Sequence, residues 1–262
     1  MVEWNPAAYN RFADQRSLPF FDLIELLPAG VGGRLLDLGC GDGRLTRIAA
    51  QRAASVEVVG VDSSASMHAA AVAGVDAVPT RWVHGDLLDW LDGDETWDLV
   101  LSNAALQFVD DHDAVFPRLL DRVAPGGWFA VHIPFNHVAR SHLLMEEAAS
   151  SPALEGAFGD FVMRWPQAPP ELYDGWIRDA GFRFVSVQLR TYRHALEGAA
   201  GIVAWMRSGG LQPWLDALAP NKHEMFLADY TDLVNRAYPP FAGDTRLLDY
   251  ARVLMVGQRP PR

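Results

Sequence analysis

The sequence contains one cysteine, Cys40, and one lysine, Lys222, among its 262 residues. A single cysteine excludes a disulfide within the chain and a cage of thiolate ligands around a metal ion. The histidines offer no replacement cluster, because His132, His137 and His142 are spaced at intervals that fit neither one helix face nor one strand face. We therefore expect a protein that holds no metal.

Positive charge and long apolar runs are also scarce. The chain has 22 basic and 33 acidic residues, a net charge of −11. Nucleic acids and anionic membranes attract proteins mainly through basic patches, so we expect neither as a partner. No apolar run approaches the ~20 residues of a membrane span, and the opening residues MVEWNPAAYNRF lack the pattern of a secretory signal. We expect a soluble, cytoplasmic protein that binds a small molecule; whether it is a monomer or a dimer stays open.

What the sequence does contain is a regular alternation of strand-like and helix-like segments. The apolar runs typical of buried parallel strands lie near 34–38, 56–61, 81–84, 97–102 and 128–133. Helical patterns separate them at 44–53, 64–72 and 111–123. This alternation predicts an α/β fold with a doubly wound sheet, whose ligands bind at the carboxyl ends of the strands.

Further segments lie outside this pattern. Residues 182–192 and 249–258 are strand-like, whereas 137–168 and 195–245 have a mostly helical pattern that a plain α/β sheet does not need. We expect one domain over residues 1–262, with 137–168 and 195–245 as insertions that form a helical cap. Residues 1–30 also show helical spacing, and we expect them to form an amino-terminal arm or lid.

The stretch LLDLGCGDGRLT places Gly39, Gly41 and Gly43 directly after the first predicted strand. Glycine costs backbone entropy, so such a cluster indicates special backbone angles or the close approach of a ligand. The spacing differs from the G-x-G-x-x-G turn of dinucleotide-binding folds. Asp62 ends the next strand, where a carboxylate accepts hydrogen bonds from the hydroxyls of a ribose. These features alone are compatible with either NAD or an adenosyl cofactor.

Four motifs in series resolve this choice: LDLGCGDG at 36–43, GVD at 60–62, HGD at 84–86 and WDLVLSN at 97–103. The series resembles that of class I S-adenosylmethionine-dependent methyltransferases. The resemblance implies a Rossmann-like, seven-stranded sheet with an antiparallel last strand, and S-adenosylmethionine as the cofactor.

The resemblance also implies which residues hold the cofactor. Asp62 would accept from the ribose hydroxyls, Asp86 would accept from the adenine amino group, and Asp37 would reach the ammonium indirectly or brace the loop. The residues expected to bind the cofactor are Arg16, Asp37, Gly39, Cys40, Gly41, Asp62, Ser63, Met67, Asp86, Leu87, Asn103 and Ala104.

Other segments are similar to the family of trans-aconitate 2-methyltransferases. They are EWNPAAYNRF at 3–12 followed by Arg16, NAALQF at 103–108, TYRH at 191–194 and GLQPWL at 210–215. The similarity extends over essentially the whole chain; Phe108 departs from the tryptophan that we expect at that position. The resemblance implies that the enzyme esterifies a carboxylate of trans-aconitate.

A carboxylate acceptor has consequences for the mechanism. Its pKa near ~4 leaves it ionised at neutral pH, so neither a general base nor a metal is required. The protein has to align oxygen, methyl and sulfur and to exclude water, which favours arginines and amides in the site. The predicted catalytic residues are Gln107, His132 and Arg193; the predicted acceptor-binding residues are Tyr9, Phe12, Gln107, Tyr192, Arg193 and Trp205.

Three alternatives remain open from the sequence. The enzyme could methylate another small acid or a phenolic metabolite, and a phenol would require a base or a metal. The chain could bind the cofactor without transferring a methyl group. It could also be an NAD-dependent oxidoreductase, although the glycine spacing and Asp86 disfavour this interpretation.

Overall fold

Two compact units make up the chain in the computed structural model, which describes residues 12–207 and 209–262. The first unit is formed by the chain up to Pro134, by Pro166–Arg190 and by Arg252–Arg262. The second unit is formed by Phe135–Trp165 and Thr191–Ala251. Two segments that are far apart in the sequence therefore fold together in the second unit. That this unit caps the strand ends of the first stays a prediction.

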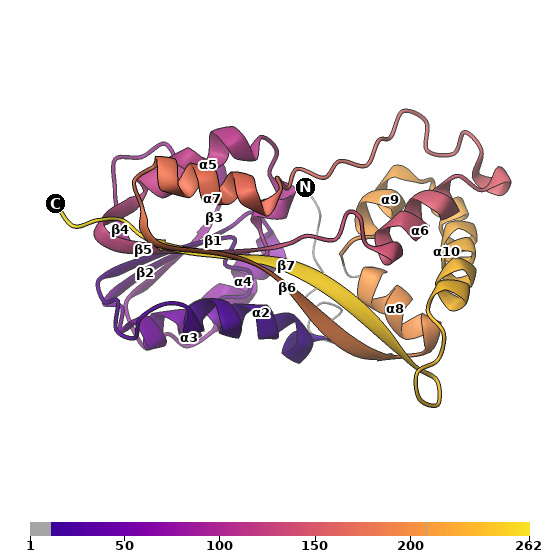
Figure 1. Ribbon diagram of the computed structural model, residues 1–262, viewed down its shortest axis with the longest axis horizontal. Coiled ribbons are helices and arrows are strands. Elements are labelled where there is room, and N and C mark those ends of the chain that lie inside the picture. Colours follow the sequence, from indigo (N-terminus) through magenta and orange to yellow (C-terminus); the bar gives the residue numbers. More distant parts are fainter. Residues whose placement is uncertain (1–11, 208) are drawn as a thin grey trace. The chain divides into compact units, whose positions relative to one another are not determined.

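A seven-stranded sheet is the framework of the first unit, with the strand order β3-β2-β1-β4-β5-β7-β6 (Figure 1). The strands are β1 (Arg34–Leu38), β2 (Glu57–Asp62), β3 (Thr80–His84), β4 (Trp97–Asn103), β5 (Val123–Pro134), β6 (Arg183–Glu197) and β7 (Thr245–Gln258). The pairs among β1 to β5 are parallel, and β7 pairs with β5 in the antiparallel direction. The predicted Rossmann-like sheet with its antiparallel last strand is confirmed.

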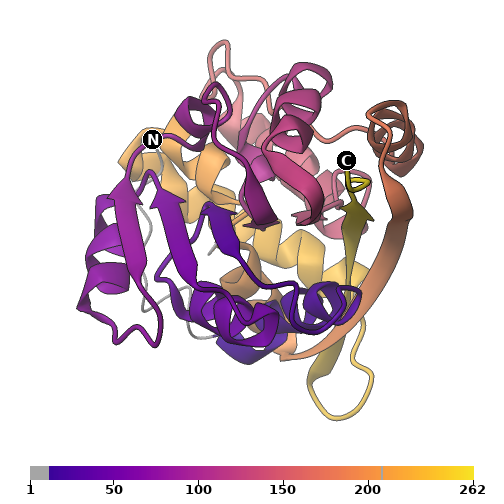
Figure 2. The ribbon, with the colours of Figure 1, turned by 90° about the vertical axis from the view of Figure 1, so that its left-hand side faces the viewer.

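Helices cover both faces of this sheet. Figures 1 and 2 show α2 (Ala13–Glu25) and α3 (Arg44–Ala53) on one face and α5 (His112–Asp121) and α7 (Pro170–Asp179) on the other. The helix α4 (Ala65–Ala73) packs against β2 and β3. Because both faces are covered, the strands read as unbroken apolar runs: Leu36, Val59 and Val100 are fully buried.

The strands after β4 are longer than their apolar runs indicate. β5 begins at Val123 rather than near 128, because the register shifts between Trp97 and Leu99 and lets the Ala124–Gly127 stretch join the strand. β6 and β7 each continue from the first unit into the second. Their outer halves contain exposed and charged positions, so apolar periodicity alone misses these strand ends.

The second unit has a helical core. Its helices are α6 (Arg140–Ala149), α8 (Gly198–Arg207), α9 (Gln212–Ala217) and α10 (His223–Ala237), with the short 3-10 turns η3 (Pro152–Leu154) and η4 (Pro220–Lys222). The longest helix, α10, packs against α6 and α8 and buries Phe226, Tyr230 and Val234 completely. The Tyr230 hydroxyl donates to the Ser141 carbonyl over 3.0 Å.

The helical expectation for 137–168 is correct only in its first half. α6 and η3 lie there, but residues 155–169 contain turns and extended chain instead of a helix. Gly156 and Gly159 adopt left-handed backbone angles, with φ of 70° and 54°, which a right-handed helix cannot contain. Pro166 and Pro169 then remove backbone donors before α7 begins.

Along the described part of the chain, no helix combines the length and apolar character needed to span a lipid bilayer. We expected residues 1–30 to form an arm, and the structure describes the helix α2 within this range. Tyr9 lies outside the described residues.

Candidate functional site

The carboxyl ends of the central strands lie next to one another in the first unit. In register, Asp37 at the end of β1 pairs with Gly60 of β2 and with Leu101 of β4, and Asn103 of β4 pairs with His132 of β5. The strand order reverses between β1 and β4, and doubly wound sheets bind ligands outside such a reversal. The predicted cofactor residues from four separate motifs therefore converge on one edge of the sheet.

The glycine turn after β1 is anchored to the end of β2. The backbone N–H groups of Gly39 and Cys40 donate to the Val61 carbonyl over 2.8 and 3.0 Å, and the N–H of Gly41 donates to Asp62 Oδ2 over 2.8 Å. Gly43, with φ of 73°, then precedes the first residue of α3. The turn is consequently a fixed element of the site.

The glycines of this turn meet different constraints. A Cβ on Gly39 would lie 2.1 Å from the Cβ of Ala105, so this residue must be glycine for the turn to pack on the loop after β4. A Cβ on Gly41 would meet no atom within 4 Å, so space is open beside this backbone. The packing of the protein itself therefore accounts for the glycine at position 39, and the space beside Gly41 is compatible with the close approach of a ligand.

Asp62 is held in place at both of its carboxylate oxygens. Oδ2 accepts from Gly41 N–H, and Oδ1 accepts from Ser64 N–H over 2.9 Å. Each carboxylate oxygen has lone pairs for a further hydrogen bond. A carboxylate that is fixed in this way is suited to accept from two vicinal hydroxyls. Ser63 lies between these anchors, and Met67 follows in the first turn of α4, buried to 7 % exposure.

Asp86 lies at the end of the neighbouring strand β3. It is exposed, and its Oδ1 accepts from Leu88 N–H over 2.9 Å at the start of the 3-10 turn η1 (Leu87–Trp90). Leu87 is the first residue of that turn and half-buried. This local hydrogen bond fixes the carboxylate at the same edge of the sheet as Asp62.

Asp37 is a buried carboxyl group with one hydrogen bond. Its Oδ2 accepts from the Thr46 hydroxyl over 2.6 Å, while its Oδ1 is buried without a hydrogen-bond partner among the described residues. Burial raises the pKa of Asp37 to about 7; the bond from Thr46 opposes this rise and the Asp62 carboxylate adds to it. The site thus contains an acidic oxygen that lacks a donor.

The Cys40 thiol contributes no nucleophile. Cys40 is buried in the turn, and burial, with the nearby Asp37 and Asp62 carboxylates, raises the pKa of this thiol. A protonated, enclosed thiol is unreactive. The role of Cys40 at this site is therefore limited to its backbone and its packing.

The loop after β4 carries the next group of predicted residues. His132 Nδ1 donates to Asn103 Oδ1 over 2.9 Å, and the Ala104 N–H donates to the His132 carbonyl over 2.8 Å. His132 is 2 % exposed, and its Nε2 is buried without a partner among the described residues. Burial and the charge of Arg252 lower the pKa of His132 well below its usual range. His132 is therefore neutral at physiological pH.

Gln107 lies in the 3-10 turn η2 (Leu106–Phe108), directly after this loop. Its Nε2 donates to the Ala104 carbonyl over 2.7 Å, and its Oε1 is buried without a partner in the described chain. The neighbouring Phe108 is 56 % exposed. The turn thus presents an unused amide oxygen beside an exposed ring.

Arg16 and Phe12 lie at the start of α2. Phe12 is buried to 8 % exposure, and Arg16 is half-buried. The next residue, Ser17, accepts a hydrogen bond over 2.7 Å from Arg44 in the first turn of α3. This bond ties the beginning of α2 to the helix that follows the glycine turn.

Three predicted acceptor residues belong to the second unit. Tyr192 and Arg193 lie on β6, and Arg193 donates two hydrogen bonds to Asp249, over 2.7 and 2.8 Å. Its side chain is 64 % exposed, and this pairing raises the pKa of Arg193. Trp205 is 2 % exposed and packs on the His194 ring at 4.4 Å between centroids.

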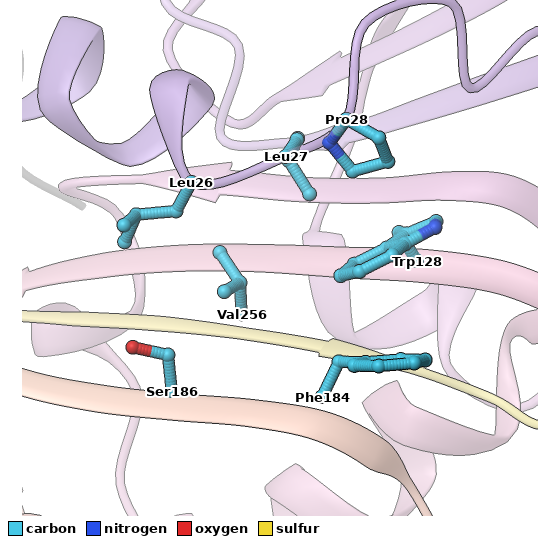
Figure 3. Close-up of a pocket in the computed structure, with 7 residues that line it drawn as sticks. All are labelled: Leu26, Leu27, Pro28, Trp128, Phe184, Ser186 and Val256. Carbon is cyan, nitrogen blue, oxygen red and sulfur yellow. The ribbon is translucent and has the colours of Figure 1, made fainter.

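The first unit also has a groove away from the strand ends (Figure 3). Its volume is about 490 Å³, and it is lined by Leu26, Leu27, Pro28, Trp128, Phe184, Ser186 and Val256. The Trp128 and Phe184 rings stack with 6.3 Å between their centroids. The lining has no charged group, and its one side-chain hydroxyl belongs to Ser186. Residues 26–28 precede the amino end of β1, so the groove is separate from the candidate site.

Sequence reasoning missed His112 and Tyr173. They form a buried hydrogen-bond chain that ends at Leu106, the residue before Gln107. The only signal available was a histidine at the start of the helix after this loop, and Tyr173 is too distant in sequence for any local pattern to connect the two.

Comparisons with known proteins identify the class of this fold. A family model described as a methyltransferase domain matches residues 35–127. Among solved structures, phosphoethanolamine N-methyltransferase 2 of Haemonchus contortus has a TM-score of 0.55 at 18% identity, covering 97% of this chain and 56% of that one. The cyclopropane synthase MmaA2 of Mycobacterium tuberculosis has a TM-score of 0.51 at 17% identity, covering 94% and 83%. The sheet topology and the family model together define a Rossmann-like methyltransferase.

Similarity along the full length gives the family. The chain is 36% identical to a trans-aconitate 2-methyltransferase of Variovorax paradoxus, with 99% of each chain covered. It is 34% identical to the enzyme of the same name from Delftia acidovorans, with all of both chains covered. The chain belongs to the trans-aconitate 2-methyltransferase family.

The buried carboxyl of Asp37 makes stability depend on pH. Between about pH 4 and pH 7 the folded chain retains a proton that the unfolded chain has lost, so this group reduces the free energy of unfolding by up to about 1.4 kcal/mol for each pH unit that the pH rises. Asp37→Asn keeps an acceptor for Thr46 and cannot ionise. We expect its unfolding free energy to fall less than that of the wild type between about pH 5 and about pH 7.5.

Urea unfolding at the two pH values measures this difference. Asp179→Asn removes one carboxylate at an exposed position and is the matched control for the change in net charge. Equal pH slopes for Asp37→Asn and the wild type would contradict the assignment of a retained proton to Asp37.

Proposed function

We propose that the protein transfers a methyl group from S-adenosylmethionine to a carboxylate of trans-aconitate. Family membership over essentially the full length of the chain is the observation that carries this choice of acceptor. The product would be a methyl ester. The acceptor would be a small molecule, because the relatives are named after trans-aconitate.

The strand-end site of the first unit fits this cofactor. Asp62, fixed by Gly41 and Ser64, provides the carboxylate for the ribose hydroxyls, and Asp86 provides an acceptor at the adenine end. The open space beside Gly41 admits the approach of the methionyl part to the backbone. The unpartnered Oδ1 of Asp37 matches the need for an acceptor toward an ammonium group, directly or through water.

When bound, S-adenosylmethionine supplies a methyl group on a positively charged sulfur, which makes this carbon electrophilic. An acceptor carboxylate is already ionised at neutral pH, so this chain has no proton to remove. The titratable groups agree with such a reaction: His132 is neutral, and the Cys40 thiol is protonated. The chain would act by alignment and by excluding water.

Fixed neutral groups would perform the alignment in the first unit. The Asn103 amide is held by His132, and the Gln107 amide is held by the Ala104 carbonyl. We therefore interpret Gln107 and His132 as groups that orient the reactants and assign neither of them the role of a base. Gln107 Nε2 is a donor for an acceptor oxygen if it exchanges its present partner.

Arg193 is the proposed anchor for an acceptor carboxylate. Its two parallel hydrogen bonds to Asp249 show that the guanidinium is presented in the geometry that a carboxylate requires. The acceptor would replace Asp249 in this pair. Tyr192, Trp205, Phe12 and Tyr9 would contribute to the same binding, and Arg16 would hold a carboxylate of either the cofactor or the acceptor.

Methyl transfer from labelled S-adenosylmethionine tests the proposed function. The panel contains trans-aconitate, cis-aconitate, citrate, isocitrate and two phenols, and we expect a clear preference for trans-aconitate. Turnover of a phenol alone would contradict a carboxylate acceptor. Cofactor binding without transfer to any member of the panel would contradict this enzymatic assignment, and a melting shift with NAD alone would contradict the cofactor.

Asp62→Ala should weaken the binding of S-adenosylmethionine. The variant loses the acceptor for the ribose hydroxyls and the anchor of Gly41, and hydrogen bonds to a charged group correspond to about a 10–100-fold rise in Kd. Isothermal titration calorimetry measures this Kd, with Asp179→Ala as the exposed control. An unchanged Kd would exclude Asp62 from the cofactor site.

Arg193→Ala should raise the KM for trans-aconitate by about tenfold, with little change in kcat, because the lost contact binds the acceptor before and during transfer. Arg178→Ala is a matched control, since Arg178 is also exposed and also donates two hydrogen bonds to an aspartate, Asp174. Steady-state kinetics at saturating cofactor measure both constants. Equal KM values for the two variants would remove Arg193 from the acceptor site.

A further inference from the structure

Three hydrogen bonds in the first unit connect the turn η2 to the helices α5 and α7. His112, the first residue of α5, contacts the Leu106 carbonyl through Nε2 over 2.9 Å and the Tyr173 hydroxyl through Nδ1. The Ala168 N–H in turn donates to the Tyr173 hydroxyl oxygen over 3.0 Å. This series of hydrogen bonds therefore connects the segment before α7 to the turn that carries Gln107.

The chemistry of the partners fixes the direction of every bond. A carbonyl oxygen only accepts, so His112 Nε2 carries the proton that is donated to Leu106. In the neutral imidazole Nδ1 is then the acceptor, and the Tyr173 hydroxyl donates to it. The oxygen of the same hydroxyl accepts from Ala168 N–H. Burial lowers the pKa of His112 and raises the pKa of Tyr173, which keeps both groups neutral at physiological pH.

The hydrogen-bond chain is enclosed by aromatic rings. Tyr173 and Leu106 are fully buried, and His112 is 3 % exposed. The Phe116 and Trp176 rings lie at 4.7 and 5.3 Å from the Tyr173 ring, measured between centroids. Water has little access to these polar atoms, so removing one partner leaves another buried group unsatisfied.

The loop that these bonds hold is strained. Ala104 and Asp111 have φ angles of 54° and 53°, and both are non-glycine residues in the left-handed region. Such angles cost of order 1–3 kcal/mol each and persist only where the surroundings enforce them. Residues 104–111 lie between the cofactor residue Asn103 and His112. The anchor at Leu106 acts inside this strained segment.

We propose that His112 and Tyr173 are positioning residues that hold the turn Leu106–Phe108, and with it Gln107, in the arrangement required for the acceptor. This proposal rests on the proposed function in one respect, the role of Gln107 toward a carboxylate acceptor. The series of hydrogen bonds also reaches Ala168. This residue lies three positions after Trp165, where the polypeptide returns from the second unit to the first. The turn and the returning segment are thus fixed by the same hydroxyl group.

Tyr173→Phe tests the proposal because it keeps the packed ring and removes only the hydroxyl. We expect kcat/KM for trans-aconitate to fall by about tenfold or more while the Kd for S-adenosylmethionine changes by less than about twofold. Tyr230→Phe is the matched control: Tyr230 is also fully buried, and its hydroxyl also donates one hydrogen bond, in this case to the Ser141 carbonyl. Equal kcat/KM losses in the two variants would overturn the proposal.

A pair of substitutions at His112 separates positioning from general packing. His112→Gln places an amide nitrogen near the position of Nε2 and can still donate to Leu106, whereas His112→Asn places its oxygen near Nδ1 and cannot. We expect His112→Gln to retain more of the wild-type kcat/KM than His112→Asn at similar melting temperatures. The reverse order would overturn the proposal, as would kinetic losses that follow only the melting temperature.

Hydrogen exchange supplies a readout that needs no activity. In Tyr173→Phe the amides of 104–112 should exchange faster than in the wild type, while those of β1 and β2 keep their rates. Unchanged exchange in this segment would overturn the proposal. If the wild type itself transfers no methyl group to trans-aconitate, the proposed function fails, and the exchange result still decides whether His112 and Tyr173 hold the turn.

Discussion

The Asp62 carboxylate is the interaction on which the candidate site depends. It accepts from the glycine turn after β1 through Gly41 and from the cap of α4 through Ser64, so one side chain joins two of the loops at the strand ends. The neighbouring Val61 carbonyl accepts from Gly39 and Cys40 and fixes the rest of the turn. These hydrogen bonds hold the turn after β1 and the cap of α4 against each other. The loop after β4, with Asn103 and Gln107, adjoins this edge of the sheet.

The buried titratable groups at this edge of the sheet carry little charge near neutral pH. The buried groups next to the strand ends are neutral or protonated: the His132 imidazole, the Cys40 thiol and, in part, the Asp37 carboxyl. None of them is a strong base at neutral pH. A phenol or an amine would have to lose a proton to such surroundings, whereas a carboxylate would not. The choice of a carboxylate acceptor rests on the family membership.

The sequence predicted those parts of the molecule that are governed by local rules. The central strands and the helices α3, α4 and α5 follow from apolar periodicity, and the gathering of Asp37, Asp62 and Asn103 follows from the parallel direction of their strands. Contacts between distant segments could not be predicted. Gly39 leaves room for the Ala105 side chain, 66 positions later in the sequence, and Tyr173 forms a hydrogen bond with His112, 61 positions earlier. The prediction of helix over 137–168 was wrong around Gly156 and Gly159, because these residues adopt left-handed φ angles that end a helix whatever the side-chain periodicity. The roles of Arg193, Tyr192 and Trp205 toward the acceptor stay predictions.

The chain passes between the two units four times, after Pro134, Trp165, Arg190 and Ala251. Two of these passages lie within β6 and β7, so the same hydrogen-bonded strands belong to both units. A protease that cuts the irregular stretch 155–165 would therefore produce two fragments that each contribute to both units, and the pairing of β5 with β7 would still join them. Recombination at a single junction could accordingly neither add nor remove the second unit, because four separate passages and two shared strands connect it to the first.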